Sequence, residues 1–96
     1  MAAITSGIVT NGISPSVGKK MLYIQTPATA DSGDTIDVTS ASVTNGETLS
    51  SVDWVVCWDQ TSGDVVTATD SSGTITIDAA GGTTDHTYAL VIVGDA

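Results

Sequence analysis

Residues 51–78, SVDWVVCWDQTSGDVVTATDSSGTITID, decide the fold of this chain. Three short runs rich in β-branched residues are separated by two clusters of turn-forming residues, Gln60–Gly63 and Asp70–Gly73. Short alternating runs joined by such clusters are typical of an antiparallel meander. The segment therefore predicts three consecutive strands in the C-terminal half of the chain.

The first of these runs is apolar on both faces. Because side chains alternate along a strand, one face would carry two valines and both tryptophans: Val52, Trp54, Val56 and Trp58. The opposite face is apolar in its middle, at Val55 and Cys57. We expect the tryptophan face to lie in the core. A sheet that is apolar on both sides also needs a cover for its second side, which points to a component of an assembly.

Further strands are expected on either side of this run. Lys20–Gln25, Asp34–Thr39 and His86–Val93 have strand-like patterns, and Asn45–Gly46 predicts a tight hairpin. No window shows the 3.6-residue apolar period of a helix. We predict an all-β fold, a small antiparallel β-sandwich or flattened β-barrel, with residues 52–58 and 86–93 inside. Residues 1–18 would be an extended N-terminal arm or edge strand, and residues 19–96 the β domain.

The N-terminal segment is the predicted site of partner binding. Its apolar residues are too widely spaced among Ser, Gly and Asn to build a core of their own, and the chain's only basic residues follow directly. We expect this segment to dock on a neighbouring copy of the chain or on the surface of the larger assembly, with the lysines facing an acidic surface on either. The candidate residues are Ile4, Ile8, Val9, Ile13, Lys19 and Lys20.

Charge and composition exclude several classes of function. The chain has 96 residues, a net charge of −9, two lysines and no arginine, and every acidic residue follows Lys20. Binding to nucleic acids or to anionic membranes needs clustered basic residues, so we expect neither partner. The first residues lack the pattern of a signal peptide, and no apolar run is long enough for a membrane-spanning helix. We expect a soluble product of the cytoplasm in which the chain is made.

Candidate chemistry is sparse. His86 beside Asp85 provides two parts of a catalytic triad, but the chain has no Gly-x-Ser-x-Gly elbow. Asp31, Asp34 and Asp37 recur every three residues, which is not the spacing of a calcium loop, so a solvated acidic loop is expected there. The single cysteine is expected to be a packed thiol. We expect no enzyme activity, no cofactor and no metal.

Residues 52–94 suggest a family. The stretch VDWVVCWDQTSGDVVTATDSSGTITIDAAGGTTDHTYALVIVG combines Trp-Asp before a turn, Gly-Thr-Ile-Thr-Ile and a final apolar strand. It resembles the small β-structured head-decoration (cement) proteins of tailed bacteriophages and related viruses. The resemblance implies a viral structural protein that binds the major capsid protein across subunits and stabilises the capsid exterior. It also implies a homo-oligomer, with a trimer favoured, that is made in the host cytoplasm and located on the virion.

A second hypothesis is a carbohydrate-binding or adhesin-like β module of a phage tail or cell surface. Trp54 and Trp58 would share a strand face and could form a platform for stacking sugar rings. The exposure of the two indoles separates the hypotheses: buried tryptophans favour decoration, whereas a solvent-facing pair favours sugar binding.

Overall fold

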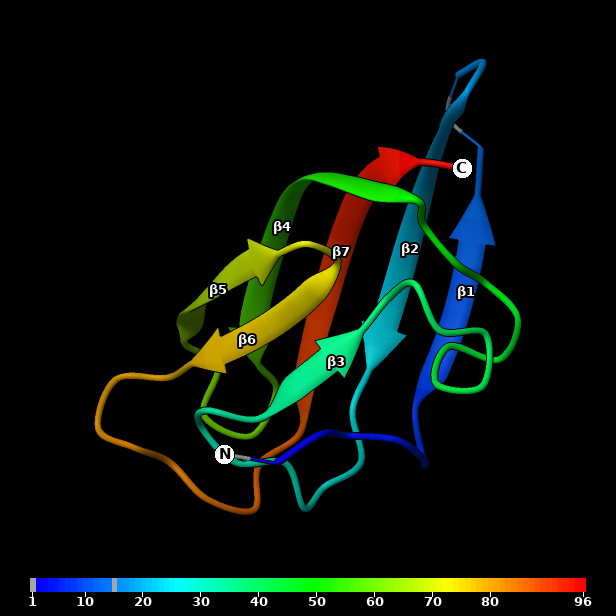
Figure 1. The fold of residues 1–96 in the computed structure, drawn as a ribbon. Coiled ribbons are helices and arrows are strands. Elements are labelled where there is room, and N and C mark those ends of the chain that lie inside the picture. The colour runs from blue at the N-terminus through cyan, green and yellow to red at the C-terminus, as the bar shows by residue number, and fades with distance from the viewer. Residues whose placement is uncertain (1, 15) are drawn as a thin grey trace.

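Seven antiparallel strands build the fold in a computed structural model that describes residues 2–14 and 16–96 (Figure 1). Within those residues there is no helix. The strands lie in the order β1-β2-β7-β4-β5-β6-β3. Their bounds are β1 Val9–Ile13, β2 Lys19–Gln25, β3 Thr35–Asp37, β4 Ser51–Asp59, β5 Val65–Ser71, β6 Thr74–Asp78 and β7 Tyr88–Asp95.

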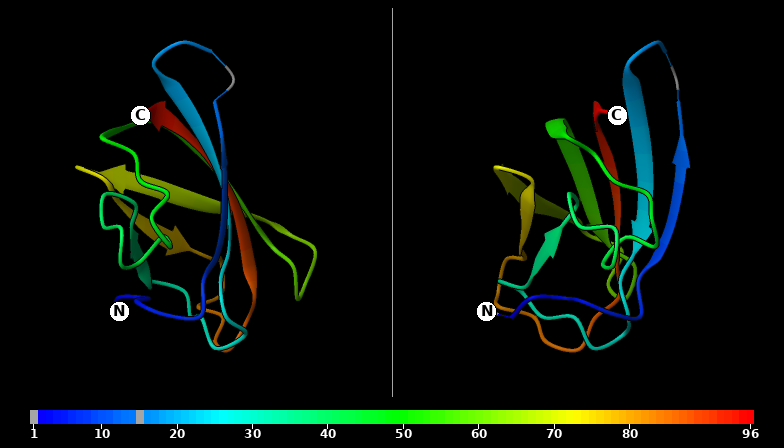
Figure 2. Two further views of the ribbon diagram at one scale, coloured as in Figure 1. Left: turned by 90° about the vertical axis from the view of Figure 1, so that its right-hand side faces the viewer. Right: turned by 45° about the vertical axis from the view of Figure 1, so that its right-hand side comes forward.

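The sheet curls on itself at β5. This strand pairs with β4 through Val65 and Val66, and with β6 from Thr67 onward. As a result β5, β6 and β3 fold over β4, β7 and β2, as the views from three directions show (Figures 1 and 2). The expected all-β class is confirmed, and β4 and β7 are central strands as predicted. The shape is a half-open barrel formed by one curled sheet.

The core fills the space inside this curl. It is built mainly from Ile, Leu and Val side chains on the concave faces of the strands, with Tyr88 as the largest fully buried side chain. Burial of such side chains removes apolar area from water and supplies the main driving force for folding. The best-buried aliphatic members are Leu22, Ile24, Ile36, Val38, Leu49, Ile75, Ile77, Leu90 and Ile92.

The two turn clusters of the meander lie where the sequence predicts them. Residues 60–63 join β4 to β5, and the second cluster joins β5 to β6 with positive φ at Ser72 and Gly73. The hairpin prediction at Asn45–Gly46 is wrong. Both residues have positive φ, as expected for a turn, but they lie in a long loop between β3 and β4. Those two strands do not pair with each other.

The N-terminal residues close one edge of the sheet. Ile4 N–H donates to Thr35 O, and Thr35 N–H donates to Ala2 O, so residues 2–4 run beside β3. Ile4 and Ile8 are buried in the core. The chain then continues into β1, which forms the other edge of the sheet and pairs with β2.

Candidate functional site: the outer face of the sheet

A β-bulge at Asp53 decides which side chains of β4 face outward. Val52 lies opposite Gly94, and Trp54 lies opposite the next residue, Val93, so Asp53 has no partner of its own. A bulge of this kind breaks the alternation of faces. Val52 packs against the core, while Trp54 points out and is 47% exposed. The prediction that the tryptophan face is core is therefore wrong.

Four strands present a continuous outward face, here called the outer face. The register aligns its side chains in three rows across β1, β2, β7 and β4, and the third row continues onto β5. The first row holds Ile13, Met21, Val93 and Trp54. The second row holds Asn11, Tyr23, Val91 and Val56. The third row holds Val9, Gln25, Ala89, Trp58 and Val65.

The outer face is almost entirely apolar. Only the amides Asn11 and Gln25 and the hydroxyl of Tyr23 interrupt it. With strands about 4.8 Å apart and rows about 6.7 Å apart, the four-strand face covers roughly 400 Å². Contiguous apolar patches of about 300–600 Å² are often functional. Its most exposed members are Val65 (85%), Ile13 (59%), Val9 (51%), Trp54 (47%) and Val56 (45%).

Polar groups frame the outer face at both ends. At one end Lys19 Nζ lies 2.7 Å from Asp95 Oδ1 and 2.8 Å from Asp53 Oδ2. At the other end Gln25 Nε2 donates to Gln60 Oε1 at 2.8 Å. An apolar centre with a polar rim is the usual anatomy of a protein-binding surface.

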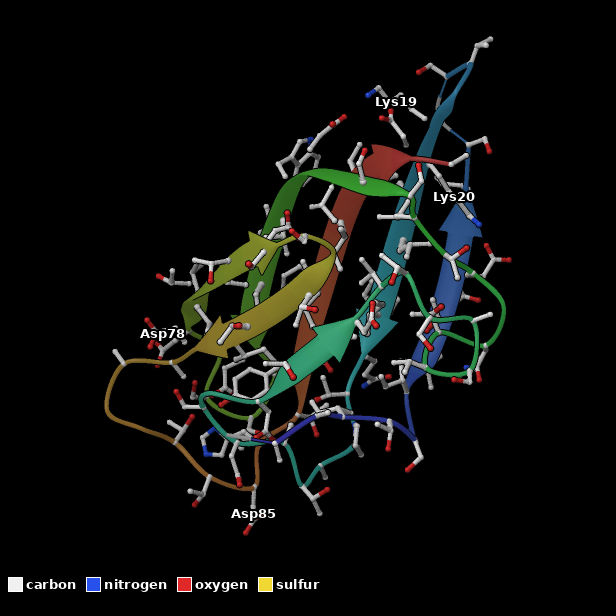
Figure 3. The ribbon with its side chains drawn as sticks, viewed as in Figure 1. Lys19, Lys20, Asp78 and Asp85 are labelled. Atoms are coloured by element: carbon white, nitrogen blue, oxygen red, sulfur yellow. The ribbon has the colours of Figure 1, made fainter. Side chains whose placement is uncertain are left out.

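Both lysines are engaged within the chain. The hydrogen bonds that Lys19 donates to the carboxylates of Asp53 and Asp95 hold the pKa of Lys19 above its ordinary value. Lys20 Nζ lies 2.9 Å from Glu47 Oε2. In Figure 3 the two lysines lie at the end of the molecule opposite Asp78 and Asp85. Both lysines thus form ion pairs within the chain, and their contact with an acidic surface of a partner stays a prediction.

The remaining sequence-predicted contact residues divide into two groups. Ile4 and Ile8 fill the chain's own core, because β3 and the loop after it supply the packing surface that the N-terminal segment lacks by itself. They are not accessible to a partner. Val9 and Ile13 lie on β1 and belong to the outer face. The structure thus brings two of the four aliphatic candidates together with the tryptophans.

A buried carboxylate pairs with the only histidine. Asp59 Oδ2 lies 2.5 Å from His86 Nδ1, and Asp59 Oδ1 accepts the N–H groups of Thr61 and Ser62. Burial alone would raise the pKa of Asp59, but these hydrogen bonds outweigh it and hold that pKa below its ordinary value. Sequence reasoning placed Asp85 beside His86 and missed Asp59, which is 27 residues away.

Asp59 and His86 are arranged like the acid and the base of a catalytic triad, but no nucleophilic serine, threonine or cysteine side chain among the described residues is hydrogen-bonded to the histidine. Burial, and then the charge of Asp59, raise the pKa of the Cys57 thiol to about 12, so the thiol stays protonated. Asp59 and His86 instead tie the β4–β5 turn to the start of β7.

The acidic loop is organised by backbone contacts. The carboxylate of Asp34 accepts the N–H groups of Ala2 and Asp31, and Asp31 accepts the N–H of Asp85. Asp37 accepts from Thr39. Across residues 2–14 and 16–96, no group of three His, Cys, Asp or Glu side chains is arranged to hold a metal ion. In this loop the aspartates serve as local acceptors.

Comparisons with known proteins provide no identification. No protein-family model, no curated protein and no solved structure matches this chain. In the part of the chain that the structure describes, no helix is long and apolar enough to cross a membrane.

Proposed function

We propose that this chain is a viral structural protein that decorates the capsid exterior and stabilises it by binding across capsid-protein subunits. The observation that carries the proposal is the outer face, an apolar surface of two tryptophans and several aliphatic side chains within a polar rim. Support for the viral setting comes from the resemblance of residues 52–94 to head-decoration proteins. The protein would act without catalysis and without a cofactor.

The proposed partner is the major capsid protein, and the proposed location is the virion surface. Each Å² of apolar area removed from water contributes about 25 cal/mol. A face of roughly 400 Å² is half of what one partner buries in a standard interface, about 800 Å². One copy would therefore bind weakly, and several linked copies on a regular shell would bind far more tightly through avidity. The resemblance implies such an oligomer, with a trimer favoured.

Carbohydrate binding is the second candidate, and the exposure of Trp54 favours it. Trp54 and Trp58 share the outer face, and four residues along a strand place them about 13 Å apart. Two indoles on one face offer two stacking positions for the rings of one oligosaccharide chain. Indole exposure, taken alone, favours sugar binding over decoration.

The neighbours of the two indoles favour a protein partner. Sugar recognition needs polar groups beside the stacking platform, because unpaired hydroxyl groups are costly to desolvate. Across the strands, Trp54 faces Val93 and Trp58 faces Ala89, and Val56 lies between the indoles. These immediate neighbours offer no hydrogen bonds to sugar hydroxyls and suit an apolar protein surface, and the polar groups at the rim already pair with one another.

The two functions are separated by one set of variants. Purified chain is mixed with particles of the virus that encodes it, stripped of this chain, and binding is read by co-sedimentation. Trp54→Ser combined with Val56→Ser should abolish binding, while Thr84→Ser, on the exposed loop between β6 and β7, should leave it intact. Wild-type chain that stays in the supernatant would contradict the decoration function.

The same variants are tested on insoluble cellulose and chitin and on a glycan array. The decoration function predicts no retention by any of these. Retention of the wild type that is lost in the Trp54→Ser, Val56→Ser variant would replace decoration by the sugar-binding function.

A further inference from the structure

One edge of the sheet is covered by another segment of the chain, and the opposite edge is not covered by any described segment. At the β3 edge, residues 2–4 run alongside and exchange backbone hydrogen bonds with Thr35. At the opposite edge, β1 pairs with β2 on one side and with no other strand of the described chain. The view onto this edge, on the left in Figure 2, shows β1 in front with no segment across it.

The free edge lacks the usual protection against pairing. Natural edge strands are blunted by lysines, prolines, bulges or covering loops. β1 reads VTNGI, contains no charged residue and no proline, and has an unbroken register with β2. Only its beginning is closed, where Asn45 Nδ2 donates to the carbonyl oxygen of Ile8. No other hydrogen bond between described residues is found along that side of β1, so its backbone groups can pair with another strand.

We propose that this edge pairs with β1 of a second copy of the chain, in an antiparallel and twofold-symmetric contact. Such a contact must be self-complementary. With Asn11 opposite its own copy on the twofold axis, Val9 lies opposite the partner's Ile13. These side chains all belong to the outer face, so apolar residues meet apolar residues and one amide meets its equivalent.

The distribution of charge also favours a second copy of the chain as the partner that pairs with β1. A net charge of −9 opposes self-association through most of the surface, but residues 2–14 and 16–18 carry no charged side chain. Lys20 and Glu47 lie beside β1 at Gly12, and their opposite charges pair at 2.9 Å. Two acidic chains can therefore approach along β1 with little repulsion.

The contact would also enlarge the outer face. In an antiparallel continuation of a sheet, paired side chains point to the same side. Two outer faces of roughly 400 Å² would then merge into one apolar surface of about 800 Å², the area that one partner contributes to a standard interface. The contact itself is independent of the proposed capsid function. It closes with two chains, whereas a trimer, the oligomer that the resemblance favours, requires a different contact.

Sedimentation equilibrium at micromolar to millimolar concentrations tests the contact without any capsid. The wild type should approach twice the monomer mass of 9.6 kDa. Asn11→Lys and Asn11→Asp each place like charges opposite each other on the axis and should weaken dimerisation by roughly tenfold or more. Mixing the two variants in equal amounts should restore the dimer, because Lys then faces Asp. Thr84→Lys, with the same added charge on a distant exposed loop, should dimerise like the wild type.

Each alternative result overturns the proposal. A wild type that remains monomeric, or that forms a trimer, excludes the β1 contact. Dimers that persist unchanged in both Asn11 variants place the interface elsewhere. A mixture of the two variants that fails to recover the dimer excludes Asn11 from the twofold axis. Circular dichroism of each variant confirms the fold, and since Asn11 is exposed, both substitutions should be accepted.

Discussion

Asp59 Oδ2 on β4 lies 2.5 Å from His86 Nδ1, and this contact joins the end of β4 to the start of β7. Asp59 is almost fully buried and also accepts the N–H groups of Thr61 and Ser62 in the β4–β5 turn. A buried carboxylate with three donors stabilises the fold while it is ionised. Removal of its charge should therefore lower the free energy of unfolding.

Acidification should destabilise the protein through Asp59. Its pKa is lower in the folded chain than the ordinary value of 3.8. The stabilisation is therefore present above pH 3.8 and is lost as the pH falls through the folded-state pKa. Asp59→Asn should lower the free energy of unfolding by about 1–3 kcal/mol at neutral pH. The variant should also lose less stability than the wild type as the pH falls. Urea unfolding between neutral pH and pH 2 measures both effects, with Asp78→Asn at an exposed carboxylate as the control. If Asp59→Asn lost as much stability on acidification as the wild type, Asp59 would not be the group responsible.

Gly94 should be intolerant of any side chain. A Cβ at this position would lie 1.8 Å from the carbonyl oxygen of Ser51, because the bulge at Asp53 brings the β4 backbone close. Gly94→Ala should destabilise the protein by roughly 3 kcal/mol or more. Gly12→Ala is the matched control, since its closest neighbour is the end of the Glu47 side chain, which can turn away, and not backbone. Equal thermal melting of the two variants would show that the bulge can relax.

The N-terminal segment should be part of the folded unit. Ile4 and Ile8 are buried in the core, so Ile4→Ala and Ile8→Ala should each cost about 2–4 kcal/mol. Deletion of residues 1–8 should lower the melting temperature more than either substitution, because it also uncovers β3. Val17→Ala, at a fully exposed residue, should change stability by no more than about 0.5 kcal/mol. A truncated chain that melts like the full chain would show that the segment is dispensable.

Local patterns were sufficient for part of this fold. The turn at Asp70–Gly73 depends on adjacent residues, and the apolar run from Tyr88 marks a central strand whatever its neighbours are. The bulge at Asp53 was not predictable, because it depends on how Gly94, on another strand, approaches Ser51. A single unpaired residue moved Trp54 from the expected core to the surface.

The same limit applies to the candidate site. The double-sided apolarity of β4 was visible in the sequence and correctly indicated a second apolar face. Contacts with residues far away in the sequence determine which face of β4 is buried. Asp59 turns inward to meet His86, and Trp58 consequently turns outward beside Val65. Decoration of a capsid stays a prediction, since neither the fold nor the comparisons test it.

The two tryptophans should separate stability from binding. Trp54 is 47% exposed, so Trp54→Ala should change the free energy of unfolding by less than about 1 kcal/mol, although the same substitution removes the largest exposed ring of the outer face. Trp58 is half-buried beside Val65 and Ala89. Trp58→Ala should therefore cost more, about 1–3 kcal/mol, which is less than its expected cost as a core residue.

Fluorescence of the Trp58→Ala variant reports on Trp54 alone. Free in solution, its emission should lie at long wavelength and be quenched by acrylamide. When the variant binds stripped particles, the emission should shift to shorter wavelength and the quenching should fall, because an apolar partner covers the indole. In the complementary variant Trp54→Ala, binding should be lost while the melting temperature stays close to that of the wild type. An indole that remains equally quenched on the particle would show that the outer face is not the contact surface.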